Sequence, residues 1–202
     1  MRVLIDGKPV DGLTAKQERD LVLSRQEEAV QGSVLAADEA TAAYARQTKR
    51  LFVILGSIAI VLMLGMSLVA DEDDRWVIVP VAIGIAGLLA TFILLLFRHR
   101  IRVWNRALDR RLAGLAPAGT AIGIDAMGLS LAGETFTWPS LAIEQVEITH
   151  FSSGPDQADP IYVIDRLSLV ASTRVIVLDK PMMRNGPQIV DNIWRRLCVA
   201  KR

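Results

Sequence analysis

Residues 66–80, "MSLVADEDDRWVIVP", join the two most apolar segments of the chain. One run without ionisable side chains ends, four acids and one arginine follow, and a second such run begins. The two runs, 51–70 and 76–97, would each form a helix of about 30 Å at about 1.5 Å per residue, which is the thickness of a bilayer's hydrocarbon core. The pattern therefore predicts two transmembrane helices joined by a short connector, 71–75.

Basic residues are distributed unequally around the two predicted spans. The connector holds one arginine, Arg75, whereas nine basic residues precede the first span or follow the second: Arg46, Lys49, Arg50, Arg98, Arg100, Arg102, Arg106, Arg110 and Arg111. Short segments rich in lysine and arginine stay in the cytoplasm, and tryptophan favours the membrane interface. We therefore expect a multi-pass protein of the inner (plasma) membrane, with both termini cytoplasmic and Trp76 at the outer interface.

The connector itself has two readings. Its four acids could supply oxygen ligands to an external divalent cation. They lack the spaced ligands and the glycine of a calcium loop, however, and a short acidic stretch between two spans is typical of a solvated turn. We expect the turn, and no metal site.

Small residues inside the spans predict close helix packing. They allow helix backbones to approach one another, and the spans contain Gly56, Ala82, Ala86, Gly87 and Ala90. These residues could seat the two spans on each other or on a partner. The spans contain no acid, base or histidine, which disfavours transport by a single chain, although an oligomeric pore lined by weaker polar groups stays open.

The segments beside the spans are predicted to be cytoplasmic. Residues 1–13 alternate around Asp6–Gly7 and predict a hairpin, and residues 14–50, rich in Ala, Glu, Gln and Arg, predict a helix broken near Gly32. Residues 98–118 predict a basic amphipathic helix and a linker. The basic part, 98–111, could rest on anionic lipid or act only as an orientation signal; no second basic patch favours nucleic acid.

Residues 119–202 change to the alternating pattern of strands. Several antiparallel strands are predicted, followed by an amphipathic helix that opens at Asn185-Gly186-Pro187. The chain is thus expected to be an α+β membrane protein, a transmembrane hairpin followed by a β-barrel or sheet closed by a C-terminal helix. The expected core positions are Phe136, Trp138, Leu141, Val146, Ile148, Ile193, Trp194 and Leu197.

Two motifs of this last segment carry a resemblance to a family. "DAMGLSLAGETFTWPSLAIEQVEI" (125–148) resembles the core of the bacterial PH-like domains of the YcxB-like type, at Asp125, Gly128, Leu129, Trp138 and Leu141. "LDKPMMRNGPQIVDNIWRRL" (178–197) resembles the family's final strand, connection and helix. The resemblance implies two spans ahead of a partly open barrel that a helix caps. It implies no activity and no catalytic residues.

Function is less constrained than architecture. Neither histidine nor the single cysteine lies in a recognisable catalytic or metal-binding pattern, and no phosphate-binding loop occurs, so we expect no enzyme and no cofactor. Residues 119–165 contain seven acids and no lysine or arginine, which disfavours lipid phosphate as a ligand of the domain and suits docking on a basic partner, including the chain's own basic helix. The sequence favours a membrane protein that binds another membrane protein or itself; a gated pore is the alternative.

Overall fold

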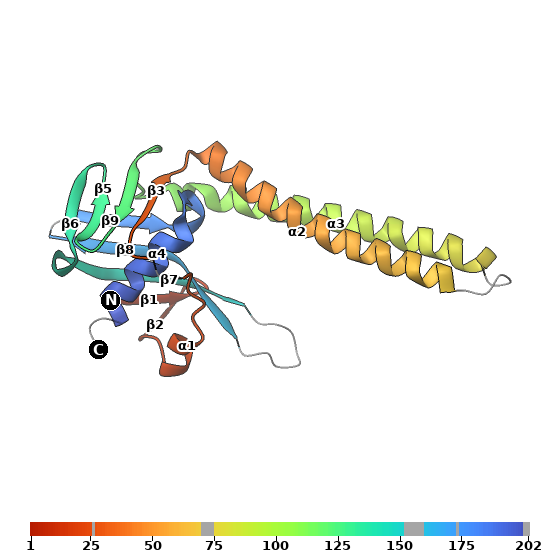
Figure 1. Cartoon of the computed structure of the whole chain (residues 1–202), viewed down its shortest axis with the longest axis horizontal. Coiled ribbons are helices and arrows are strands. Elements are labelled where there is room, and N and C mark those ends of the chain that lie inside the picture. Colours follow the sequence, from red (N-terminus) through yellow and green to blue (C-terminus); the bar gives the residue numbers. More distant parts are fainter. Residues whose placement is uncertain (26, 70–74, 152–159, 173, 200–202) are drawn as a thin grey trace. The chain divides into compact units, whose positions relative to one another are not determined.

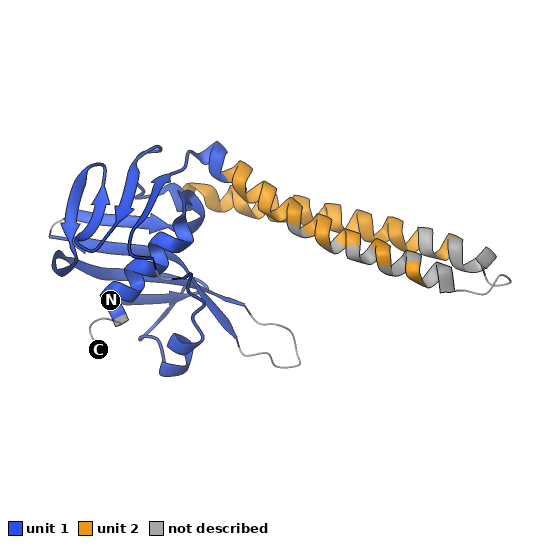
Figure 2. Cartoon of the chain, in the orientation of Figure 1, with its two compact units in different colours: residues 1–40, 110–202 blue, residues 41–109 orange. Residues whose placement is uncertain are grey.

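The computed structural model describes most of the chain in two compact units. Its described residues are 1–25, 27–69, 75–151, 160–172 and 174–199. Unit 1 comprises residues 1–40 and 110–202, and unit 2 comprises residues 41–109 (Figure 2). The four acids of the connector, 71–74, lie outside the described residues, so the two readings of that connector stay predictions. The boundaries differ from those expected, because the N-terminal segment belongs to the same unit as the C-terminal domain.

One sheet of unit 1 is antiparallel throughout. Its order is β10-β3-β4-β5-β6, with bounds Met183–Arg184, Val30–Val34, Ala121–Ile124, Gly128–Leu131 and Glu134–Thr137. Strand β3 precedes both long helices and β4 follows them, yet the two strands pair directly, with Ser33 opposite Ala121 and Val30 opposite Ile124. The helices of unit 2 are therefore an insertion between two neighbouring strands.

The second sheet is mixed. Its order is β2-β1-β7-β8-β9, with bounds Lys8–Val10, Arg2–Ile5, Leu141–Phe151, Ile161–Ala171 and Arg174–Asp179. The predicted N-terminal hairpin is confirmed, and its turn residues Asp6 and Gly7 both have positive φ, as a two-residue hairpin turn requires. The strands predicted between residues 120 and 180 pair antiparallel, as expected, whereas β1, from the N-terminal segment, pairs in parallel with β7.

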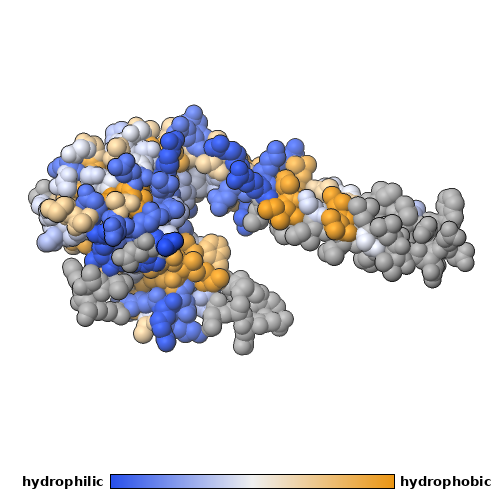
Figure 3. All heavy atoms as spheres, in the orientation of Figure 1, coloured by the Kyte–Doolittle hydropathy of each residue, from blue (hydrophilic) through white to orange (hydrophobic). Residues whose placement is uncertain are grey.

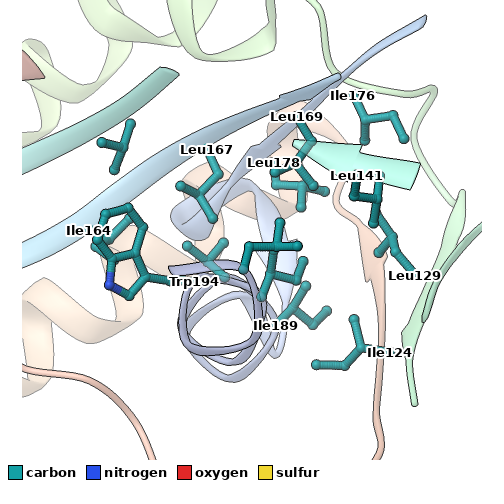
Figure 4. Close-up of a cluster of buried hydrophobic side chains, with 14 of the residues drawn as sticks. Ile124, Leu129, Leu141, Ile164, Leu167, Leu169, Ile176, Leu178, Ile189 and Trp194 are labelled. Atoms are coloured by element: carbon teal, nitrogen blue, oxygen red, sulfur yellow. The ribbon is translucent and has the colours of Figure 1, made fainter. Parts of the chain in front are cut away.

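The C-terminal helix fills the space between strands of both sheets. Pro181 interrupts the chain after β9 in the turn η3 (Lys180–Met182), and α4 (Gly186–Trp194) begins after Asn185, as predicted; it continues into η4 (Arg195–Val199). Helix α4 contacts β3 and β4 of one sheet and β8 and β9 of the other. Figure 4 shows its Ile189 and Trp194 among the buried side chains of the strands.

The predicted helix over residues 14–50 is wrong in its first half. A short helix, α1 (Ala15–Arg19), begins with a capping box between Thr14 and Gln17, and an extended segment then leads to β3. Side chains of α4 hold this segment: Asp191 accepts the backbone N–H of Ser24 at 2.8 Å, and Asn192 accepts that of Glu27 at 3.1 Å. These long-range hydrogen bonds override a local composition that favours helix.

Gly32 does not mark a break in a helix. It lies in the middle of β3, where an added Cβ would approach the carbonyl oxygen of Arg184 to 2.1 Å and Cδ1 of Ile189 to 2.7 Å. The missing side chain thus lets β3 run close to β10 and α4.

Two long helices form unit 2. Helix α2 (Ala37–Val69) and helix α3 (Arg75–Leu112) run side by side in Figure 1. The basic segment that begins at Arg98 continues α3 without interruption, as its sequence predicts. Pro80 lies near the start of α3, where a missing N–H removes little hydrogen bonding.

Candidate membrane-interaction site

One helix among the described residues is long and apolar enough to cross a membrane. It is Gly84–Leu112, with 29 residues and a mean hydropathy of 1.6 in its most apolar window, none of which is buried. The sequence predicts two such segments. Residues 51–69 of the first predicted span lie in α2. In the part of the chain that the structure describes, this segment is not found to be long and apolar enough to cross a membrane. Among the residues that the structure describes, one candidate span is thus found, Gly84–Leu112, and a second is not shown.

Apolar side chains point outward along both helices of unit 2. Exposed large hydrophobic residues fall between 53 and 61 on α2 and between 81 and 103 on α3; Val61 is 66% exposed and Leu88 is 73% exposed. Figure 3 shows orange, apolar surface along the described part of the hairpin and blue, hydrophilic surface towards the end that holds the arginines. Water is a poor solvent for such a surface, so lipid or another protein must cover it.

The contacts between α2 and α3 define one antiparallel register. Trp104 Nε1 donates to Thr41 Oγ1 at 3.2 Å, and the Trp104 ring stacks on Tyr44 with centroids 4.3 Å apart. Further along, Phe52 meets Phe97 edge to face at 6.3 Å. As the residue number rises on α2 it falls on α3, so the two helices form a hairpin.

The small residues expected at the helix interface divide into two groups. A Cβ on Gly56 would lie 3.8 Å from Cδ1 of Ile93, so Gly56 faces α3. A Cβ on Gly87 would meet nothing within 4 Å, and Ala90 is exposed, so these two residues do not pack α3 on α2; their packing on a partner stays a prediction. Ala86 is half-buried, and the side chain of Ala82 lies outside the described ones.

The basic residues expected at the membrane boundary are exposed on both helices. Arg46, Lys49 and Arg50 lie on α2, and Arg98, Arg100, Arg102 and Arg106 lie on α3. Phe52 and Phe97 lie close to Arg50 and Arg98 in the sequence, so the register places the ends of both charge-free stretches at one level. Trp76, expected at the opposite boundary, is helical, but its side chain is outside the described ones.

The last turn of α3 belongs to unit 1, where charged contacts bind it to the strands. Arg111 Nη1 donates to both carboxylate oxygens of Asp179 on β9, at 3.1 and 3.2 Å. Arg166 of β8 donates to the carbonyl oxygens of Arg110, at 2.8 Å, and of Ala113, which occupies carbonyl groups left free at the end of α3. Arg110 also pairs with Glu147 of β7 at 3.4 Å.

Asp179 is the buried charge of this junction. Its side chain is 1% exposed, and burial raises its pKa to about 6, while the attraction of Arg111 and Arg166 offsets only part of that rise. A second buried pair, Lys180 Nζ to Asp191 Oδ1 at 2.6 Å, lies between η3 and α4. Neither ion pair was predicted from the sequence. The segment "LDKP" (178–181) contains Asp179 and Lys180, but it does not show that their partners are the distant residues Arg111 and Asp191.

The expected core residues of the C-terminal domain lie at the centre of unit 1. Leu141, Val146, Ile148, Ile193, Trp194 and Leu197 are buried, and Phe136 and Trp138 pack partly buried against them. Trp138 Nε1 donates to the carbonyl oxygen of Asp125 at 3.1 Å, and the guanidinium of Arg196 lies 5.0 Å from its ring centroid. These residues stabilise the fold.

The remaining titratable side chains form no recognisable metal centre in the described part of the chain. No three His, Cys, Asp or Glu side chains there lie close enough to hold a metal ion. His150 faces Asp6 at 3.7 Å and packs on Tyr162, with ring centroids 5.4 Å apart, at the end of the β7–β8 pair.

Comparison with known proteins identifies no relative: no family model, no curated protein and no solved structure matches the chain. The resemblance to the bacterial PH-like domains therefore stays a prediction.

Proposed function

We propose that this chain is a non-catalytic integral protein of the inner membrane. Its hairpin of α2 and α3 crosses the bilayer twice, and unit 1 lies in the cytoplasm. There unit 1 binds a protein partner, as an accessory subunit of a larger membrane complex.

The observation that carries this proposal is the pairing of β3 with β4. The two strands flank the whole hairpin in the sequence and share one sheet, so they must lie on the same side of any membrane. Residues between them can cross a bilayer only an even number of times. If α3 crosses, as its exposed apolar surface favours, then α2 must supply the second crossing. The β1–β7 pairing imposes the same parity.

The register of the hairpin supports two crossings at matched depth. The pair Phe52–Phe97 sets the first apolar turn of the stretch 51–70 beside the last apolar turn of the stretch 76–97. The predicted spans 51–70 and 76–97 therefore enter the bilayer at one level, and the arginines on both helices lie just outside it. The connector, rich in acids, would then lie on the opposite side, in agreement with the distribution of basic residues.

The proposed fold of unit 1 is PH-like. Helix α4 contacts strands of both sheets, which suits a partly open barrel capped by a helix. The three acids Asp125, Glu134 and Glu144 are exposed, and Arg174 pairs with Glu134 at 2.9 Å. Residues 119–165 contain seven acids and no lysine or arginine. A local excess of acids is repelled by anionic lipid, which favours a protein ligand with basic side chains.

Cysteine labelling tests the topology. In a Cys198→Ser background, single cysteines replace exposed residues of unit 1, Arg25 before the hairpin and Met127 after it, or Glu72 in the connector. We expect a membrane-impermeant maleimide to label Glu72→Cys in intact spheroplasts, and the other two only after permeabilisation. Opposite labelling of Arg25→Cys and Met127→Cys would refute the even number of crossings.

A crosslink tests the hairpin itself. Gly56→Cys combined with Ile93→Cys should form a disulfide in the same background, because these positions face each other. Gly56→Cys with Gly87→Cys is the matched control, since nothing lies within 4 Å of a Cβ on Gly87. Equal crosslinking of both pairs would contradict the register.

Crosslinked pull-down from native membranes tests the accessory role. A membrane protein captured reproducibly at low expression would support it, and capture of none at any expression level would overturn it. The alternative, an oligomeric pore, predicts a closed ring with measurable conductance. Thr91, the polar residue on the exposed face of α3, donates its hydroxyl to the carbonyl oxygen of Gly87 at 2.9 Å, so it does not need a water-filled lumen.

A further inference from the structure

The basic residues of both helices gather at the same end of the hairpin, and we call this group the collar. The collar consists of Arg46, Lys49 and Arg50 on α2 with Arg98, Arg100, Arg102 and Arg106 on α3, all exposed. We propose that this collar binds the headgroups of anionic lipids in the cytoplasmic leaflet. This inference rests on the proposed function, because it needs the hairpin in the membrane.

The register places most of the collar close to the ends of the two charge-free stretches. It lies between two contacts that hold the helices together, Phe52–Phe97 on one side and Tyr44–Trp104 on the other, with Arg106 just beyond the second. At about 1.5 Å per residue, Arg102 lies about 8 Å along α3 from Phe97. The headgroup region on each side of a bilayer is about 5–8 Å thick. Arg98, Arg100 and Arg102 therefore fall within the headgroup layer.

The collar carries charge that the described part of the chain does not neutralise. None of its seven residues forms an ion pair among the described residues, and the sequence has no acid from 40 to 70 or from 75 to 108. Arg98, Arg102 and Arg106 follow one another at intervals of four, so their side chains repel along one helix face. Such a face is stabilised by anions from outside the chain.

Lipid fits the collar better than an acidic protein segment does. The charges come from both helices near the ends of the two charge-free stretches, and they continue directly into exposed apolar side chains such as Leu95 and Leu96. A headgroup layer offers negative charge at that depth, next to acyl chains that cover the apolar residues. Each basic residue near an anionic surface contributes about 1 kcal/mol of binding free energy.

Lipid selectivity of the full-length protein tests the proposal. The protein is reconstituted in vesicles of phosphatidylcholine with a minor fraction of spin-labelled phosphatidylglycerol or spin-labelled phosphatidylcholine, and electron paramagnetic resonance measures the motionally restricted fraction of each. We expect a preference for phosphatidylglycerol that falls as salt rises. The variant with Arg98, Arg100 and Arg102 all changed to Gln should lose most of it, and the same positions changed to Lys should keep it.

A matched control removes as much charge elsewhere. Arg2, Arg25 and Arg184 are exposed on unit 1, and changing all three to Gln should leave the preference unaltered. The proposal is overturned if the natural protein shows no preference for phosphatidylglycerol, or if the control variant loses that preference equally. It is also overturned if the collar variant keeps the preference and fails only to capture an acidic protein in the crosslinked pull-down. Vesicle flotation separates this failure from that of the proposed function: a protein that floats with phosphatidylcholine vesicles and resists carbonate, yet shows no preference, refutes the lipid collar alone.

Discussion

The substitution Asp179→Asn probes the buried junction between α3 and the strands. Asp179 is 1% exposed and accepts two hydrogen bonds from Arg111. Asparagine has nearly the same shape and keeps one acceptor oxygen, but it carries no charge. The variant therefore removes the titration of this group and leaves the packing in place.

The size and sign of the effect follow from the pKa of Asp179. It is about 6 in the folded protein, against about 3.9 for aspartate in an unfolded chain. The folded state thus binds the proton more tightly, so this group stabilises the fold most below about pH 4, and that stability is lost as pH rises to about 6. Two pKa units correspond to about 3 kcal/mol in the free energy of unfolding. The geometry alone would favour the opposite sign, because Arg111 and Arg166 attract the charge; burial exceeds that attraction.

Urea unfolding of the full chain in mild detergent, followed by tryptophan fluorescence, measures the effect between pH 4.5 and 8. We expect the free energy of unfolding of the natural protein, minus that of Asp179→Asn, to fall by about 2 kcal/mol over this range. The matched control, Glu134→Gln, removes an exposed carboxylate paired with Arg174 and should show little change. A difference that stays flat or rises with pH would mean that the arginines outweigh burial, and the reasoning fails.

Two further predictions concern contacts that hold the N-terminal segment and α4. Gly32→Ala places a Cβ against the backbone of Arg184 and should destabilise unit 1 by about 1–3 kcal/mol, measured by the same unfolding assay; Gly84→Ala, where space is open, is the control, and equal effects would contradict the close approach. Lys180→Ala leaves the buried Asp191 without its cation and should destabilise by about 3–5 kcal/mol. Adding Asp191→Asn should recover part of that loss, and no recovery would show that the ion pair is not the cause.

The strands between residues 120 and 180 could be predicted because their signal is local. Alternation in the segments 120–126 and 142–151 and turn residues such as Gly133 give the pattern directly, and the strands lie where expected. The start of α4 was equally predictable from Asn185-Gly186-Pro187. In each case the residues that decide the structure are neighbours in the sequence.

The N-terminal half of unit 1 could not be predicted in the same way. Residues 20–34 have a helix-favouring composition, and what makes them extended lies about 150 residues or more away in the sequence, in Asp191, Asn192 and Arg184. The parallel pairing of β1 with β7 is a second distant contact. The membrane boundary was partly predictable: exposed arginines and apolar residues follow the sequence, whereas the outward orientation of Gly87 and Ala90 depends on the register.

The insertion of the hairpin between β3 and β4 links the pairing of α2 with α3 to the folding of unit 1. The sheet closes at that point through two backbone hydrogen bonds, from Val34 to Thr120 and from Gly119 to Val34, at 3.0 and 2.9 Å. A flexible loop of about 90 residues would oppose this closure by about 4 kcal/mol of entropy. A packed hairpin removes most of that cost, because contacts such as Trp104 with Thr41 hold its two ends together. We therefore expect the β3–β4 pairing of unit 1 to form more readily once α2 and α3 have paired.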